Sequence, residues 1–389
     1  MIKKPSHPST TLVTAGRESR LNHGIVNPPV YHASTILHPT VESLEKKTLP
    51  YSYGRRGTPT TTALQDAIAE IEGGYRTLLA PSGLSAVTTA LLAHLDHGDH
   101  LLMVDTVYGP TRSFCEGILR RFGIEVDYYD PLIGAGISKL FKSNTKVVFT
   151  ESPGSLTFEV QDIPAIAAAA HARNIIVMLD NTWATPLFFR AFDHGVDICI
   201  EAATKYFCGH SDVMMGSITC TQATYDKTLA GHGTLGVSVA PDDVYLLLRG
   251  MRTMGVRLKQ HMETGLQLAN WLKAQPEVAR VLHPALESDP GHALWKRDFT
   301  GASGLFSILL KPCAHDAMAA MLDHLEYFGM GYSWGGFESL IVPQYPRSVR
   351  SATKWQEDGY LLRIHAGLED ASDLIADLDA GLARLRAYG

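Results

Sequence analysis

Two side chains of opposite charge, Asp180 and Lys205, come shortly after segments that the sequence predicts to be buried strands. Asp180 follows the apolar run 175–179, and Lys205 follows the run 197–201 after three small residues. The strands of an open, mostly parallel α/β sheet end at a shared edge, where such proteins bind their ligands. We therefore expect the carboxylate and the amine to lie in one site at that edge.

The neighbours of Lys205 distinguish it from an ordinary surface lysine. It stands among small and aromatic residues, in the stretch AATKYFCGHSD. Such surroundings favour a desolvated amine whose pKa can fall. Taken singly, Lys205 could be a solvated lysine and Asp180 a turn or helix cap. Together they suit pyridoxal phosphate, because the lysine can form an imine with its aldehyde and the aspartate can keep its ring nitrogen protonated.

That cofactor also needs a site for its phosphate group. Residues 80–85 lie between a predicted strand and a predicted helix. The main-chain amides of Gly83 and Leu84 can therefore point at an anion bound to the helix N-terminus. An ordinary helix start would have the same sequence, so both interpretations stay open for this segment alone.

Short apolar runs alternate with helical patterns between residues 58 and 250. Helices are expected at 60–72, 84–95 and 163–173. The alternation predicts an α/β domain over 58–250, with a mostly parallel sheet that has helices on both faces. The expected strands are 77–80, 101–104, 125–129, 147–150, 175–179, 198–201 and 215–220.

The pattern differs on either side of this domain. Residues 1–57 form an arm punctuated by proline and glycine, and we expect it to pack on another domain or subunit. Residues 251–389 predict a smaller α+β domain. Its expected elements are a long helix at 256–272, strands at 304–310 and 360–365, and helices at 316–328 and 371–388.

The composition excludes several classes of protein. Of the 389 residues, 45% are hydrophobic and 19% charged, and the net charge of −6 comes without a basic run that would suit nucleic acid. The five cysteines form no CxxC pair, which favours a reducing cytoplasm over disulfides or a zinc ribbon. The first twenty residues lack the apolar core of a secretory signal, and polar residues interrupt the most apolar stretch, 163–179. We expect a cytoplasmic protein with no membrane span.

Seven motifs occur in one order along residues 51–343. They are YGRRGTPT, PSGLSA, VYGPT, ESPGS, DNTWATP, AATKYFCGHSD and SWGGFESLIVP. These motifs and their order resemble those of the Cys/Met-metabolism family of PLP-dependent enzymes. The resemblance implies PLP fold type I, the aspartate-aminotransferase-like fold. The surroundings of Trp183 and Trp334 resemble most closely the β-lyases of that family.

The resemblance assigns cofactor contacts residue by residue. Lys205 corresponds to the lysine that holds pyridoxal phosphate as an internal Schiff base, and Asp180 to the partner of the ring nitrogen. Gly83 and Leu84 correspond to the amide cradle of the phosphate, and Thr204 to a hydroxyl that also contacts it.

The same resemblance implies a substrate site. Tyr108 corresponds to an aromatic residue that stacks on the cofactor ring and takes a proton from the substrate amine. Arg363 corresponds to the arginine that clamps the substrate α-carboxylate, a task that suits a bidentate guanidinium. Ser333 and Trp334 correspond to residues that line the substrate pocket.

Two further residues are implied to act in a neighbouring subunit. Tyr53 and Arg55 correspond to phosphate ligands that cross from one subunit to another, and Tyr53 would help Tyr108 to order the substrate. This would explain the extended arm. The resemblance implies a homotetramer built from dimers that share active sites.

The reaction implied is β-elimination from an L-amino acid that carries a thioether. L-cystathionine would give homocysteine, pyruvate and ammonia, a step of transsulfuration and methionine biosynthesis, and related cysteine S-conjugates would give other thiols. Lys205 would remove the Cα proton and return a proton to the leaving sulfur. The alternative within the family is γ-elimination or γ-replacement, as in the γ-lyases.

Three other motifs invite different hypotheses. The GxGxxG at 231–236 does not follow a strand, so chance explains it better than a dinucleotide site. The GxSxG at 331–335 offers Ser333, with Asp358 and His365, as a remote serine-hydrolase alternative, but a strand rather than a helix is expected after it. His94, His97 and His100 lie near a predicted helix end, where histidines are commonly solvated, and we expect no metal there.

Overall fold

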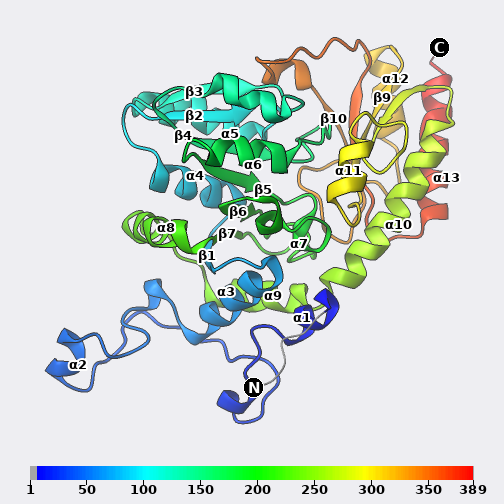
Figure 1. Ribbon diagram of the computed structural model, residues 1–389. Coiled ribbons are helices and arrows are strands. Elements are labelled where there is room, and N and C mark those ends of the chain that lie inside the picture. The colour runs from blue at the N-terminus through cyan, green and yellow to red at the C-terminus, as the bar shows by residue number, and fades with distance from the viewer. Residues whose placement is uncertain (1–6, 389) are drawn as a thin grey trace.

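The larger part of the molecule is built around a seven-stranded sheet. The computed structural model describes residues 7–388, and its strands lie in the order β1-β7-β6-β5-β4-β2-β3 (Figure 1). Only β7 runs against its neighbours, β1 and β6. This confirms the mostly parallel α/β sheet. The strands are β1 (Arg76–Ala80), β2 (His100–Val104), β3 (Glu125–Tyr129), β4 (Thr145–Glu151), β5 (Ile176–Asp180), β6 (Ile198–Glu201) and β7 (Gly216–Cys220).

Helices cover both faces of this sheet because neighbouring residues of a strand point to opposite sides. In β1, Leu78 packs in the core that α4 helps to form, whereas Leu79 packs in a separate core with α3 and α9. Two hydrophobic layers therefore hold the sheet from its two sides. The helices are α3 (Pro59–Glu72), α4 (Gly83–His94), α5 (Gly109–Phe114), α6 (Ile163–His171), α7 (Thr185–Phe188), α8 (Gln222–Thr234) and α9 (Pro241–Met251).

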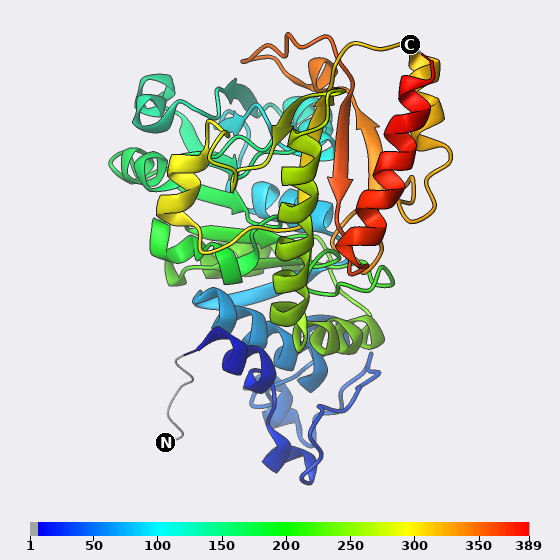
Figure 2. The same ribbon diagram turned by 90° about the vertical axis from the view of Figure 1, so that its right-hand side faces the viewer.

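A second, antiparallel sheet of four strands forms the core of the C-terminal part. Its order is β10-β11-β9-β8. Helix α10 leads into this part, and Figure 2 shows it as the long yellow-green helix on the same side of the molecule as α13. The smaller α+β unit is confirmed. Its elements are α10 (Met254–Lys273), β8 (Val278–Leu282), α11 (His292–Asp298), β9 (Leu305–Leu310), α12 (His315–Leu322), β10 (Leu340–Gln344), β11 (Leu361–His365) and α13 (Ala371–Arg386).

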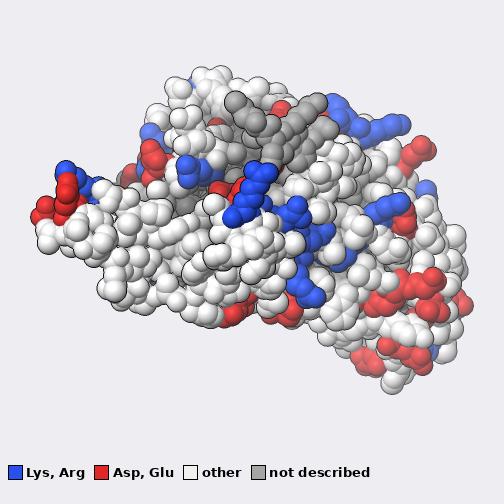
Figure 3. Space-filling view, turned by 90° about the horizontal axis from the view of Figure 1, so that it is seen from below, with Lys and Arg blue, Asp and Glu red and all other residues white. Residues whose placement is uncertain are grey.

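The chain between α1 (Pro8–Thr14) and α3 extends away from the rest of the molecule in both ribbon views (Figures 1 and 2), whereas α1 packs beside α3 and α10. The extended segment contains the short helix α2 (Val41–Glu45). Large apolar side chains stand in solvent along it, among them Leu21 at 80% and Leu37 at 83% exposure. Seen from below, its surface is mostly uncharged, with charges of both signs at its tip (Figure 3). The segment leaves this apolar surface uncovered within a single chain.

Two of the three histidines expected to be solvated are buried, so that expectation was wrong. His94 lies on the face of α4 that packs against α8, and its Nε2 is 2.9 Å from the Thr228 hydroxyl. His100 is fully buried in β2, with its Nδ1 2.8 Å from the Thr145 hydroxyl. Burial lowers the pKa of His94 to about 4, so it is uncharged at neutral pH.

The GxGxxG motif lies at the end of α8 and not between a strand and a helix. Its glycines therefore form no dinucleotide cradle. None of the helices in the described part of the chain is both long and apolar enough to span a membrane.

Candidate active site

The carboxyl ends of three neighbouring strands open into one cavity of about 470 Å³. Asp180 is the last residue of β5 and pairs in register with Glu151, the last residue of β4. Lys205 lies in the turn that follows β6. The expected meeting of Asp180 and Lys205 at one sheet edge is therefore observed. The cavity is also lined by Gly83, Leu84, Tyr108, Trp183, Thr204, Ser333, Trp334 and Arg363.

The Lys205 amine is held by residues of the C-terminal part. Its Nζ donates a hydrogen bond of 2.7 Å to Ser333 Oγ and lies 5.0 Å from the centre of the Trp334 ring. Burial lowers its pKa to about 8, and the positive charge of Arg363 adds to this effect while Asp180 opposes it. A lysine with such a pKa is partly uncharged at neutral pH and can act as a nucleophile or a base.

The Asp180 carboxylate is fixed by Thr182. Asp180 Oδ1 accepts hydrogen bonds from the Thr182 main-chain N–H at 3.1 Å and from its hydroxyl at 2.5 Å. The same hydroxyl accepts the N–H of Ala202 at 2.8 Å, which ties Asp180 to the turn that carries Lys205. Within residues 7–388, no group donates to Oδ2. Burial raises the pKa of Asp180, and the Thr182 bonds and Lys205 oppose the rise, so a cationic partner in the cavity would stabilise its ionised form.

The N-terminus of α4 offers main-chain amides to an anion. The Ser82 side chain caps the helix by accepting from the Ser85 N–H, and no described group accepts from the amides of Gly83 and Leu84. A Cβ at position 83 would lie 2.5 Å from the Ala202 Cβ, so only glycine fits there. These free amides and the helix dipole form an anion site beside the cavity.

The Thr204 hydroxyl lies at the cavity but already has main-chain partners. It donates to the Met215 carbonyl at 3.1 Å and accepts from the Met215 N–H at 2.8 Å. Contact with a phosphate through the hydroxyl hydrogen would require this rotor to turn.

Arg363 is the cation available for a substrate carboxylate. It lies in β11, and its Nη2 donates to the Ser333 carbonyl at 3.0 Å. In the described part of the chain it pairs with no carboxylate. Burial lowers its pKa to about 10, so it stays charged at neutral pH. Its free donors suit bidentate binding of a carboxylate.

His365 contacts the main chain of the loop that carries Ser333 and Trp334. The Nε2 atom of this histidine lies 3.1 Å from the Gly335 N–H and 3.1 Å from the Gly336 carbonyl. Ser333 has a backbone φ of +85°, and a Cβ on Gly335 would press on Lys205. The loop therefore needs its glycine to approach the lysine closely.

The serine-hydrolase geometry does not form at Ser333. Its hydroxyl pairs with Lys205, whereas His365 bonds to the main chain of the loop. Asp358 pairs with Arg347 on the surface. The loop leads into strand β10 instead of a helix, as expected from the sequence.

Tyr108 stands at the mouth of the cavity, at the start of α5. Its main-chain N–H donates to Glu151 Oε2 at 2.8 Å. Burial raises the pKa of its phenol, and Arg363 opposes the rise. Tyr108 is 47% exposed and lines the cavity, so it can contact both the cavity and a molecule entering it.

Tyr53 and Arg55 do not line this cavity within one chain. Arg55 donates to the Gly233 carbonyl at 3.0 Å, and its guanidinium lies 6.0 Å from the centre of the Tyr53 ring. Tyr53 is 45% exposed. Any contact of these two residues with an active site would be with that of another subunit.

The model of the Cys/Met metabolism PLP-dependent enzyme family matches residues 9–383. The chain belongs to this family. It is 53% identical over 383 residues to a putative cystathionine beta-lyase of Rhizobium johnstonii, covering 97% of this chain and 96% of the relative. It is 46% identical over 387 residues to cystathionine beta-lyase MetC of Escherichia coli, covering 97% and 98%.

A third relative carries a different name. An L-alanine/L-glutamate racemase of Wolbachia pipientis is 43% identical over 390 residues, which cover 96% of both chains. Among solved structures, a cystathionine gamma synthase from Xanthomonas oryzae is 30% identical with a TM-score of 0.92, covering 99% of this chain and 100% of that one. These comparisons confirm PLP fold type I and a PLP-dependent enzyme.

The cavity fits pyridoxal phosphate as this family requires. The amine of Lys205 suits an aldehyde. Oδ2 of Asp180, to which no described group donates, suits a protonated ring nitrogen. The free amides of Gly83 and Leu84 suit a phosphate. The donor set is therefore complementary to the three polar ends of the cofactor.

No role was predicted for Glu151 or Thr182, and His365 was named only in the serine-hydrolase alternative, although Glu151 and Thr182 contact site residues and His365 contacts the loop that carries two of them. Glu151 and Thr182 stand inside the motifs ESPGS and DNTWATP. Glu151 ends a strand beside Asp180, and that shared position was the available signal. His365 gave no such signal because its loop partners lie 29 and 30 positions away.

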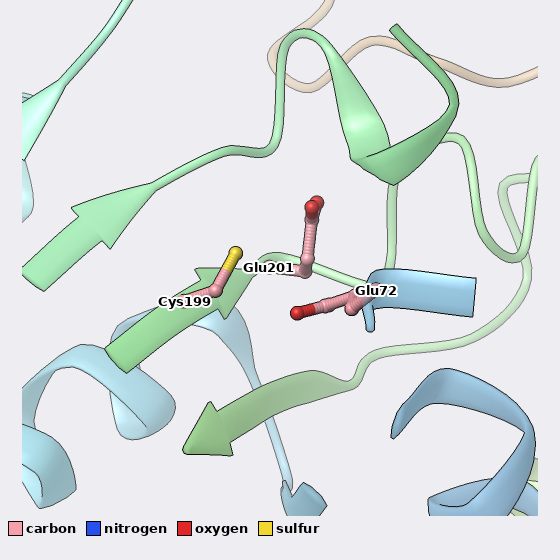
Figure 4. A group of neighbouring side chains, drawn as sticks. All are labelled: Glu72, Cys199 and Glu201. Carbon is pink, nitrogen blue, oxygen red and sulfur yellow. The ribbon is translucent and has the colours of Figure 1, made fainter. Parts of the chain in front are cut away.

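A cluster of three ionisable side chains, Glu72, Cys199 and Glu201, lies in the core of the part that contains the seven-stranded sheet (Figure 4). Their ligand atoms lie within 4.8 Å of one another, and all three side chains are buried. Burial raises the pKa of Glu72 to about 8 and that of Glu201 well above its usual range. The two carboxyl groups are therefore uncharged acids at neutral pH.

Proposed function

We propose that this enzyme is a carbon–sulfur β-lyase that cleaves L-cystathionine with water to homocysteine, pyruvate and ammonia. Related cysteine S-conjugates would give the corresponding thiol. The observation that carries the proposal is the Lys205 amine, held by Ser333 in a cavity that also contains an unpaired Arg363. The relatives named cystathionine beta-lyase, up to 53% identical over nearly the whole chain, support the same activity.

Bound pyridoxal phosphate supplies an aldehyde that takes up the substrate amine and a protonated ring that withdraws electrons from Cα. Asp180 would hold the ring nitrogen, and Thr182 keeps that carboxylate in place. The main-chain amides of Gly83 and Leu84 would hold the phosphate, and Thr204 would join them once its hydroxyl turns away from the Met215 carbonyl. The fixed dipoles of the two amides would orient the ring.

Lys205 moves the protons of the reaction. In the loaded enzyme its uncharged amine would accept the proton from the substrate Cα, and the resulting ammonium would donate a proton to the sulfur as the Cβ–S bond breaks. The lowered pKa of Lys205 suits both roles near neutral pH. Ser333 accepts a hydrogen bond from this amine and so keeps it within reach of Cα.

Arg363 binds the α-carboxylate of the substrate through its free guanidinium donors. Tyr108 would take a proton from the substrate amine in its phenolate form and, with Tyr53 of a neighbouring subunit, would order the substrate. Trp334 forms the pocket wall beside the lysine. Trp183 lies deeper and is fixed by a bond from its Nε1 to the Leu305 carbonyl at 2.9 Å.

Product analysis with L-cystathionine tests the proposal against γ-elimination. β-Cleavage gives pyruvate and homocysteine, whereas γ-cleavage gives 2-oxobutyrate and cysteine. Because γ-synthases share this fold, the two product pairs must be measured together. A predominance of 2-oxobutyrate would assign the enzyme to the γ-lyases.

A second candidate function is amino-acid racemisation, which the relative named L-alanine/L-glutamate racemase favours. The first step, removal of the Cα proton, is the same for both reactions. Incubation with L-alanine, followed by chiral chromatography, separates them. D-Alanine formed at a rate comparable to cystathionine cleavage would support racemisation.

The assembly is the third part of the proposal. We place residues 1–57 as an arm against a neighbouring subunit, 58–250 as the PLP-binding domain and 251–389 as the C-terminal domain. Large apolar side chains of the arm are exposed in a single chain, which supports packing of the arm against a second copy of this chain. Tyr53 and Arg55 would then bind the phosphate of the partner's cofactor in a homotetramer.

A cytoplasmic location completes the proposal. The five cysteines are free thiols, and four of them are buried. Free thiols persist in a reducing compartment. Fractionation of the source cells with an antibody would place the protein directly.

A further inference from the structure

Glu151 is an ionisable side chain of the cavity that the proposed reaction does not use. It ends β4 beside Asp180, with which it pairs in register. Its carboxyl group lines the same cavity as Lys205, Tyr108 and Arg363. A carboxyl group at the edge of a catalytic cavity with no assigned task suggests a supporting role.

The direct contact of Glu151 is with Tyr108. Its Oε2 accepts the Tyr108 main-chain N–H at 2.8 Å. Tyr108 is the N-cap residue of α5, but its own side chain makes no capping hydrogen bond to that helix. A second link joins the same two segments, because the Ser155 N–H donates to the Thr106 carbonyl at 2.8 Å. The position of Tyr108 at the cavity therefore depends on the end of β4 and on the segment that follows it.

The electrostatic surroundings favour an uncharged Glu151. Burial raises its pKa well above the usual range, the Asp180 carboxylate adds to the rise, and the Tyr108 N–H opposes it. In the described part of the chain no lysine, arginine or histidine forms an ion pair with it. Two adjacent carboxylates without a cation between them repel, so one of them keeps its proton.

We propose that Glu151 is a positioning residue, whose carboxyl oxygen holds Tyr108 at the mouth of the cavity. This inference rests on the role proposed for Tyr108. An uncharged carboxyl accepts an N–H through one oxygen, and a glutamine amide offers the same acceptor at the same place. Displacement of a catalytic side chain by about 1 Å can lower the rate by about a hundredfold.

Three variants test the inference in the cofactor-loaded enzyme. Tyr108→Phe removes the phenol hydroxyl, Glu151→Ala removes the acceptor, and Glu151→Gln keeps an acceptor without a charge. We expect Y108F and E151A each to lower kcat/KM by about tenfold or more. E151Q should recover most of the loss seen in E151A. The double variant E151A/Y108F should be no worse than Y108F, because both changes act on one group.

Measurements other than activity guard the interpretation. Bound cofactor per chain and melting temperature should stay near wild type in E151Q, and a crystal structure of E151A should show Tyr108 displaced. If E151A does not fold, Glu151→Asp serves instead, because its shorter side chain withdraws the acceptor and should reproduce the Y108F defect.

Two outcomes would overturn the positioning role: losses in E151A and Y108F that multiply, or an E151Q as impaired as E151A. A loss in Y108F with full activity in E151A would also reject it while leaving the β-lyase proposal intact. If Y108F itself loses nothing, the proposed role of Tyr108 fails first.

Discussion

The Lys205 Nζ and the Ser333 Oγ lie 2.7 Å apart although 128 positions separate the two residues in the chain. Lys205 belongs to the part of the molecule with the parallel sheet, and Ser333 belongs to the C-terminal part. The active site therefore forms only when the two parts are packed together. Any movement between them would change the surroundings of the lysine amine.

The first prediction concerns the pH dependence of cofactor binding. Only the uncharged form of Lys205 reacts with an aldehyde, and its pKa in the cofactor-free protein is about 8. The rate of pyridoxal phosphate binding should therefore rise with pH and reach half of its maximum near pH 8, as followed by stopped-flow absorbance.

Arg363→Leu provides the matched variant for this prediction. Removing the positive charge of Arg363 raises the pKa of Lys205, so the midpoint should move to higher pH. A midpoint close to that of an ordinary lysine in the wild-type protein would contradict the burial of the amine.

The second prediction tests the link between Asp180 and Thr182. Thr182→Val keeps the shape of the side chain but loses the hydroxyl that donates to Asp180 and accepts from Ala202. We expect the affinity for pyridoxal phosphate to fall by about tenfold to a hundredfold, since hydrogen bonds to charged groups contribute about 1.5–3 kcal/mol. Equilibrium dialysis of the cofactor measures this.

Thr182→Ser is the control because it keeps the hydroxyl. It should bind the cofactor nearly as tightly as the wild type. Equal affinities in T182V and the wild type would mean that Asp180 needs no such support.

The third prediction concerns stability and the buried acid Glu72. Its pKa is about 8 in the folded protein, against a usual value of 4.5. Between these values the folded state binds more protons at Glu72 than the unfolded state, so the contribution of Glu72 to stability is greatest below about pH 4.5 and falls as pH rises to about 8. Glu72→Gln removes the ionisation and should flatten this dependence.

The stability gain of E72Q over the wild type should be small near pH 5 and on the order of a few kcal/mol near pH 8. Denaturant unfolding at several pH values measures it. A gain that does not change with pH would show that Glu72 does not titrate in this range.

The fourth prediction tests the shared active site. A hybrid of an Arg55→Ala subunit and a Lys205→Ala subunit contains one intact site if Arg55 acts across the interface. Co-expression of the two chains should then restore about one quarter of the wild-type activity, since half of random dimers are hybrids with one of two sites intact.

The pair Asp180→Ala and Lys205→Ala is the control, because both residues belong to the same subunit's site and no hybrid repairs either site. It should stay inactive. If the Arg55 pair shows no more activity than R55A alone, Arg55 does not reach a neighbouring site.

The sequence was sufficient where a local pattern determines position. Apolar runs followed by Asp180 and by the Lys205 turn predicted two strands and one shared sheet edge, and the register of β5 and β6 agrees. The Gly83 turn was equally local, because a strand, a turn and a helix follow one another. These positions depend on neighbours a few residues away.

The sequence was insufficient where packing between distant elements decides. His94 was expected in solvent, but α8, which was not predicted, covers it through Thr228. The carboxyl groups of Glu72 and Glu201 lie close together, although the ends of α3 and β6 that carry them are far apart in the chain. No local pattern indicates such contacts, because they depend on how helices pack on the sheet.

The covalent attachment of the cofactor tests the central claim most directly. The loaded enzyme should absorb near about 420 nm and lose this band on treatment with borohydride. Digestion and mass spectrometry should then locate the reduced pyridoxyl group on the peptide that contains Lys205. A label on any other lysine, or a band that survives in Lys205→Ala, would contradict the account.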